Sequence, residues 1–194
     1  GTYSNASGLT DAASCQRCPA GSYCPLGSFF PTSCPAGRYG ETTRLQDPRC
    51  SGPCAAGYYC PQGSILATAK PCSSGRANPL LGATSSAACI ECARGSVASE
   101  SRSATCEQCQ GGKYQAQSGQ SSCRDCPIGA SCVEGSVAPE ACPPGSFSGA
   151  LGRSSCAPCQ GGTFQGAANQ TACKACPRGF YCSPRATTAI PCDM

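Results

Sequence analysis

The chain has 194 residues, of which 22 are Cys, none is His or Trp, and only 12% are charged, for a net charge of +4. This cysteine content is typical of a disulfide scaffold rather than of a domain with a large apolar core. The lack of His removes the usual general base and the commonest metal ligand. The scattered charges form no basic run for nucleic acid, and no apolar stretch is long enough for direct membrane insertion. We therefore expect no enzyme and no cofactor.

A repeat runs along the whole chain, beginning at Gly1. A Gly followed two residues later by an aromatic residue recurs, and alignment on this pattern divides the sequence into eleven short modules. We predict one continuous cysteine-rich array with the modules 1–18, 19–34, 35–54, 55–72, 73–92, 93–109, 110–126, 127–142, 143–159, 160–176 and 177–192, numbered 1 to 11 below. Because Gly1 already occupies the Gly position of a module, we expect a fragment of a longer chain.

The modules are of two kinds. In four of them a Cys directly follows the aromatic position, and we call these split modules; they carry Cys24, Cys60, Cys132 and Cys182. The other seven are plain and end in a close Cys pair, such as Cys106 and Cys109. The predicted fold class is small and disulfide-rich: a linear array of turns and short β-strands, forming an elongated rod with little or no helix.

Turn signals recur at fixed places in the modules. Pro-x-Gly opens several of them, because Pro fixes φ and Gly permits positive φ. Later in the plain loops, Gly119 and Gly152 share one position with Asn169, which indicates a left-handed turn residue. Arg102 stands at that position in its module, so we expect a different turn there. We expect each recurring aromatic ring to cover the disulfide of its own module.

The Cys spacing favours one pairing frame but leaves others open. Pairing neighbours from Cys18 gives loops of nearly constant size, as one reused geometry requires. The pairs are Cys18–Cys24, Cys34–Cys50, Cys54–Cys60, Cys72–Cys89, Cys92–Cys106, Cys109–Cys123, Cys126–Cys132, Cys142–Cys156, Cys159–Cys173 and Cys176–Cys182. Cys15 and Cys192 would then pair with Cys outside the fragment. Close pairs such as Cys15–Cys18, and crossed pairs such as Cys123–Cys132 with Cys126–Cys142, are the alternatives.

One motif resembles a known family. The pattern appears as Cys142-Pro-Pro-Gly-Ser-Phe followed by Cys156-Ala-Pro-Cys159, and again between Cys109 and Cys126. It resembles the ephrin-receptor-like cysteine-rich repeats, which are relatives of the plain half-modules of tumour-necrosis-factor receptors. The unbroken run is most similar to arrays in large algal and protist surface proteins. The resemblance implies an extracellular or cell-surface location and rod-like stacks held by disulfides.

Two surface features are candidate sites. The sequons Asn5-Ala-Ser7 and Asn169-Gln-Thr171 predict N-glycosylation at Asn5 and Asn169. A binding face would need an exposed cluster of anchoring side chains, and only the longer Cys34–Cys50 and Cys72–Cys89 loops offer one. These loops contain the candidates Arg38, Arg44, Arg49, Leu80 and Leu81.

We expect a structural segment of a secreted or surface-displayed filament or matrix protein, of the flagellar-hair or sheath kind. Its partners would be other copies or other chains of the assembly, together with covalent glycans. The alternative is the stalk or ligand-binding ectodomain of a cell-surface receptor or adhesin. An intracellular array in which the C-x-x-C pairs bind zinc is a third reading, which the surplus Cys of the split modules disfavours.

Overall fold

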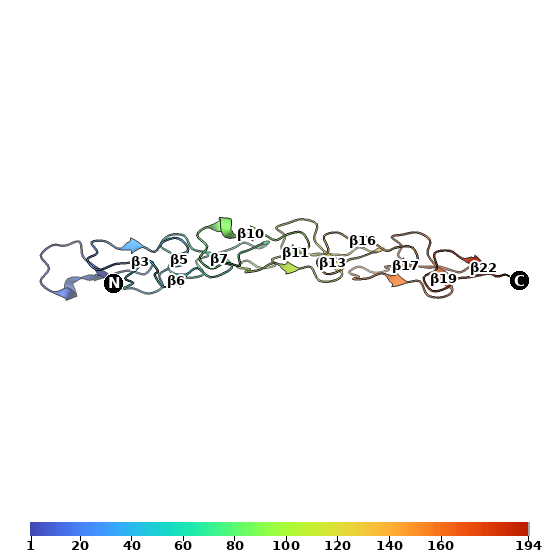
Figure 1. Cartoon of the computed structure of the whole chain (residues 1–194), viewed down its shortest axis with the longest axis horizontal. Coiled ribbons are helices and arrows are strands. Elements are labelled where there is room, and N and C mark those ends of the chain that lie inside the picture. The colour runs from blue at the N-terminus through green and yellow to red at the C-terminus, as the bar shows by residue number, and fades with distance from the viewer. Residues whose placement is uncertain (194) are drawn as a thin grey trace. The chain divides into compact units, whose positions relative to one another are not determined.

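The structure is a computed structural model that describes residues 1–193. Its β-structure consists of eleven antiparallel two-stranded sheets, each made of two-residue strands (Figure 1). The sheets pair β1 (Thr2–Tyr3) with β2 (Gln16–Arg17), β3 (Ser22–Tyr23) with β4 (Thr32–Ser33), β5 (Arg38–Tyr39) with β6 (Gly52–Pro53), β7 (Tyr58–Tyr59) with β8 (Lys70–Pro71), β9 (Arg76–Ala77) with β10 (Ile90–Glu91), β11 (Ser96–Val97) with β12 (Glu107–Gln108), β13 (Lys113–Tyr114) with β14 (Arg124–Asp125), β15 (Ala130–Ser131) with β16 (Glu140–Ala141), β17 (Ser146–Phe147) with β18 (Ala157–Pro158), β19 (Thr163–Phe164) with β20 (Lys174–Ala175), and β21 (Phe180–Tyr181) with β22 (Ile190–Pro191).

The described helices are two 3₁₀ turns, η1 (Ala12–Ser14) and η2 (Ser86–Ala88). Each two-stranded sheet lies within one of the eleven segments defined from the repeat, with the Gly-x-aromatic pattern leading into its first strand. The predicted fold class, a small disulfide-rich chain of short strands with almost no helix, is therefore confirmed.

At least ten of the eleven hairpins share one closing backbone bond. The Cys that follows the second strand donates its N–H to the carbonyl of the Gly that precedes the first strand. Examples are Cys126 N to Gly112 O at 2.8 Å and Cys142 N to Gly129 O at 2.9 Å. The Gly adopts positive φ, +90° at Gly112 and +79° at Gly129, a region that residues with a Cβ rarely occupy.

The chain divides into two compact units. Unit 1 contains Gly1–Glu91 with Ala98–Cys106, and unit 2 contains Cys92–Val97 with the chain from Glu107 onward. In both units the most buried side chains are mainly Cys, such as Cys54 in unit 1 and Cys126 in unit 2, together with a few Ala. The core of each unit is therefore a series of disulfides rather than an aliphatic layer, as expected for a chain so poor in large apolar residues.

Within each unit, a module bonds to the next module and to the next but one. In unit 2, Gly112 donates to Cys132 O of the following module at 2.7 Å. Gly152, two modules further along than Gly112, donates to Cys126 O at 2.9 Å. In unit 1 the corresponding bonds run from Gly57 to Asn78 O and from Gly82 to Cys54 O, both at 2.8 Å. Because these bonds use only backbone atoms, they can be repeated with different side chains.

The contact with the next module but one explains the recurring Gly. A Cβ on Gly129 would lie 2.6 Å from Asn169 Oδ1 and 2.7 Å from Asn169 O, which is too close for a real Cβ contact. A Cβ on Gly112 or Gly145 would collide in the same way with the carbonyl of Gly152 or Arg185. Both the positive φ and the close backbone approach therefore require Gly at this position.

The prediction that the module containing Arg102 turns differently is wrong. Arg102 has a φ of 71°, within two degrees of Gly119 and Gly152, and Asn169 has 61°. Its N–H donates to Cys72 O at 2.8 Å, just as the N–H of Gly119 donates to Cys92 O. Left-handed backbone costs an L-residue about 1–2 kcal/mol, and the bonds to neighbouring modules hold it there. The Arg102 side chain is exposed, so it meets no packing conflict.

One of the recurring aromatic rings contacts the core of the following module. Tyr114 packs against the buried cluster of Cys126, Ala130 and Cys132. The disulfide that it covers, Cys126–Cys132, closes the turn of the following split module. The ring of one module therefore contributes to the core of the next, which adds a side-chain contact to the backbone bonds between them.

Candidate functional site

The disulfides form the chemically distinctive frame of the molecule. Nine have Cα–Cα distances of 5.6 to 6.1 Å, within the range that a disulfide spans, and they join Cys18–Cys24, Cys34–Cys50, Cys54–Cys60, Cys72–Cys89, Cys109–Cys123, Cys126–Cys132, Cys142–Cys156, Cys159–Cys173 and Cys176–Cys182. Cys92 and Cys106 are also disulfide-bonded. In the described chain, half-buried Cys15 and exposed Cys192 remain as thiols. These pairs are the ones obtained by joining neighbours from Cys18.

A second set of buried residues lies directly after the first strand of modules 2 to 11. In split modules this residue is a Cys, and in four plain modules it is a buried polar residue: Asn78, Gln115, Ser148 or Gln165. Gln115 Nε2 donates to Ser122 O at 2.7 Å, and Gln165 Nε2 donates to Ala172 O at 2.8 Å. The side-chain amide thus ties the plain loop to its hairpin. The sequence reasoning missed this role, although the position always lies six residues after a Cys.

No group of three or more His, Cys, Asp or Glu side chains among residues 1–193 is placed to hold a metal ion. No helix in the described chain combines the length and the apolar character needed to cross a membrane. The sites left to consider are therefore the glycosylation sequons and the two longer loops.

Both sequon asparagines are exposed, as are Ser7 and Thr171, which complete the sequons. Asn169 occupies the left-handed turn position with a φ of 61°, and its N–H donates to Cys142 O at 2.8 Å. Its Oδ1 faces the Cα of Gly129. The left-handed turn at Asn169 is thus at the position expected from the sequence. Glycosylation at Asn5 and Asn169 stays a prediction.

The arginines of the Cys34–Cys50 loop are bound to other groups of the same loop or lie on a turn. Arg38 donates through Nη1 to Arg49 O at 2.8 Å, and Arg49 Nε donates to Asp47 Oδ1 at 3.2 Å. The hydrogen bond from the Arg49 side chain lowers the pKa of Asp47, which is solvent-exposed. Arg44 is exposed at a left-handed turn, with a φ of 66°.

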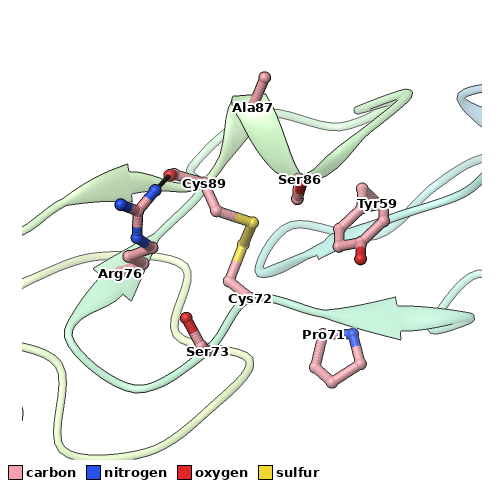
Figure 2. A pocket seen from close by; sticks show the side chains of 8 residues that line it. All are labelled: Tyr59, Pro71, Cys72, Ser73, Arg76, Ser86, Ala87 and Cys89. Atoms are coloured by element: carbon pink, nitrogen blue, oxygen red, sulfur yellow. Dashed lines mark hydrogen bonds between the residues drawn. A yellow bond between two sulfur atoms is a disulfide. The ribbon is translucent and has the colours of Figure 1, made fainter.

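The Cys72–Cys89 loop carries two features. Leu80 and Leu81 are 69% and 66% exposed. Beside the disulfide lies a hollow of about 440 Å³, lined by Tyr59, Pro71 and Cys72 from module 4 and by residues of module 5 (Figure 2). The sequence reasoning named the loop but not this hollow, because Tyr59 belongs to the preceding module.

Comparison with known proteins agrees with the repeat. The model of a family described as tyrosine-protein kinase ephrin type A/B receptor-like matches residues 95–142 and 145–191. No curated protein sequence matches the chain significantly. The matched segments span plain and split modules alike, so residues 95–191 are similar to ephrin-receptor-like cysteine-rich repeats. The many disulfides and this kind of module indicate an extracellular protein, and the family suggests a non-enzymatic module.

Proposed function

We propose that the chain is a structural segment of a secreted or surface-displayed filament or matrix protein. The observation that supports this most is the repeated junction, in which each module bonds through its backbone to the next two within a unit. Such an array is stabilised by its neighbours and extends by addition of further modules. It presents many repeated surfaces, as a building element of an assembly requires.

The proposed partners are other copies or other chains of the same assembly. The proposed covalent ligands are N-linked glycans on Asn5 and Asn169, both of which are exposed. The loops carry few charges and many small polar side chains. Neighbouring chains can therefore pack densely without strong electrostatic repulsion.

The test is localisation of the native protein by immunoelectron microscopy. Antibodies raised against the folded, oxidised chain should decorate extracellular filaments or matrix at regular intervals. Antibodies raised against an unrelated surface protein of the same cells serve as the control. Labelling spread over the plasma membrane and absent from any filament would contradict the proposal.

A receptor or adhesin ectodomain is a second candidate, because the hollow on module 5 is the kind of feature that a ligand-binding segment would present. Release of the native protein by phospholipase or detergent alone, as a single unassembled species, would favour this candidate. Release only after disulfide reduction would favour the filament.

A further inference from the structure

Module 5 departs from its sister modules beside its disulfide. The Cys72–Cys89 loop has a sequence separation of 17, against 14 for Cys142–Cys156 of module 9, and the added residues include η2. The hollow beside Cys72–Cys89 has about 440 Å³, against about 200 Å³ for the corresponding hollow beside Cys156. The larger falls within the range of about 300–1,000 Å³ that is usual for small-molecule sites. A different hollow beside Cys156, of about 480 Å³ and lined by Phe147 and Arg153, also falls within this range, so the proposal depends on the lining rather than on size.

The lining of the larger hollow combines an aromatic ring with polar groups. Figure 2 shows Tyr59 on one side of the disulfide and Arg76 on the other, with Ser86 of η2 above the ring. In the repeat around the module 9 disulfide, the corresponding residues are Ser131, which replaces Tyr59, and Ser146, which replaces Arg76. The smaller hollow therefore lacks the aromatic ring, and the guanidinium that lines it is that of Arg185, which comes from module 11.

The guanidinium of Arg76 is held by two hydrogen bonds, and the carboxylate of Glu91 compensates its positive charge. Arg76 Nη1 donates to Cys89 O at 3.1 Å, and Arg76 Nη2 donates to Glu91 Oε1 at 2.5 Å. A guanidinium has five N–H donors, so donors remain for a ligand. Because Glu91 balances the positive charge, the hollow favours a neutral ligand that accepts hydrogen bonds over an anion.

Two hydroxyl groups complete the lining. The hydroxyls of Ser73 and Ser86 make no hydrogen bond within residues 1–193, and both residues are exposed. Each can both donate and accept, which suits a ligand that itself carries several hydroxyls.

We propose that this hollow binds a neutral hexose or N-acetylhexosamine unit of an extracellular glycan. The apolar face of the sugar ring packs on Tyr59, since aromatic rings provide a flat apolar surface with a polar rim. Arg76 donates to sugar oxygens, and Ser73 and Ser86 exchange hydrogen bonds with sugar hydroxyls. The segment then holds a glycan without a covalent link, which goes beyond the structural role proposed above.

The test uses the full oxidised chain and two soluble disaccharides, cellobiose and N,N′-diacetylchitobiose, in saturation-transfer NMR titrations. We expect saturation transfer to the sugar ring protons of at least one disaccharide. Tyr59→Ser and Arg76→Ser each introduce the residue found at the corresponding place around the module 9 disulfide, and each should weaken binding at least tenfold. Arg38→Ser is the matched control, because Arg38 holds the same module position and also donates to a loop carbonyl, but it belongs to module 3 and does not line this hollow. It should leave binding unchanged.

Three results would overturn the proposal. The first is no transfer to either disaccharide at millimolar concentration. The second is binding that survives Arg76→Ser, or that Arg38→Ser weakens equally. The third is displacement of the sugar by millimolar sodium sulfate, which would reveal an anion site. If Tyr59→Ser fails to fold, as disulfide mapping would show, Arg76→Ser alone decides, because its side chain is on the surface.

Discussion

Modules 8 and 9 are neighbours in unit 2 and represent the split and the plain type. Both have the same hairpin, β15 with β16 and β17 with β18, and both begin with a Gly of positive φ. The two modules differ in the residue that lies six positions after the Cys preceding the hairpin. Cys132 there is bonded to Cys126, whereas Ser148 is hydrogen-bonded to Ala150 O and Cys142 pairs with the distant Cys156.

The comparison shows that the backbone bonds define the module and that the covalent tie is interchangeable. Cys132 is 1% exposed and Ser148 is 2% exposed, so the site is equally buried in both types. In plain module 3, a Cβ built on Gly40 would lie 2.9 Å from Cys34 Sγ. The position after the first strand is therefore beside the preceding Cys even where no disulfide joins them.

Reduction of all disulfides is the perturbation with the largest expected effect, and it should abolish both types of module together. Each bridge lost from a small stapled domain costs about 2–5 kcal/mol, and the described chain has almost no other core. Amide hydrogen exchange in the presence of a strong phosphine reductant should show loss of protection throughout. Protection that persists in the split modules alone would mean that their backbone bonds suffice.

Substitution of the shared Gly should damage both types equally. Gly129→Ala in module 8 and Gly145→Ala in module 9 combine left-handed strain, about 1–2 kcal/mol, with overpacking, about 1–3 kcal/mol. Gly162→Ala is the control, because Gly162 has a φ of +82° but no atom within 4 Å of an added Cβ. Thermal unfolding should show the two test variants clearly less stable than the control. Equal losses in all three would exclude the close approach as a cause.

Removal of one disulfide should distinguish the types. Replacing Cys142 and Cys156 by Ser opens a loop of about 15 residues, which costs about 3 kcal/mol in the chain-entropy model. Replacing Cys126 and Cys132 opens a much smaller loop, for which the same relation gives about 2 kcal/mol. Denaturant unfolding of the two double variants measures the difference. A larger loss in the split module would show that Cys132 contributes through packing as well.

A plain module should be convertible into a split one. In Ser148→Cys with Cys156→Ser, residue 148 lies six residues after Cys142, as Cys132 does after Cys126. We expect a disulfide between Cys142 and the new thiol at position 148, with a loss of stability of about 1 kcal/mol, the difference between the two loop entropies. Peptide mapping without reduction identifies the bond.

The control for this conversion is Ser155→Cys with Cys156→Ser, in which the new Cys lies one residue from the old one. We expect it to leave Cys142 without a well-formed partner, because neighbouring residues point in different directions. A free thiol at position 148 in the conversion variant would show that the two module types are not interchangeable.

The smallest expected effect concerns Asn169. Asn169→Gly introduces the residue found at the same turn in Gly119 and Gly152, so the melting temperature of the unglycosylated chain should change little. The same change in material secreted by eukaryotic cells should remove the mass of one N-glycan, as measured by intact-mass spectrometry. An unchanged mass would show that Asn169 carries no sugar.

Much of the local structure could be predicted from the sequence, because Cys and Gly spacing reports directly on short hairpins. The predicted array of turns and short strands is present, the repeated Gly precedes the first strand of each hairpin, and the position of Asn169 indicated its positive φ correctly. These features are visible in the sequence because Gly and Asn are the residues that best tolerate a positive φ.

The features that were not predicted from the sequence depend on contacts between modules. The left-handed backbone of Arg102 is held by Cys72 O, thirty residues earlier in the chain, and nothing in the side chain signals it. Tyr59 and Arg76 line one hollow from two modules. The amide of Gln115 replaces a disulfide, and this substitution is visible only once both module types are superimposed on the same backbone bonds.

The disulfide loops also determine how such a chain responds to mechanical load. A pulling force can straighten only residues outside a closed loop, so the segment between Cys142 and Cys156 cannot add to the contour length while their bond is intact. A plain module therefore holds a longer stretch of chain inside its disulfide loop than a split module does, as the sequence separations of 14 and 6 show. The proportion of the two types therefore sets how far the chain can extend under load before covalent bonds resist it, and reduction of the disulfides would increase that extension.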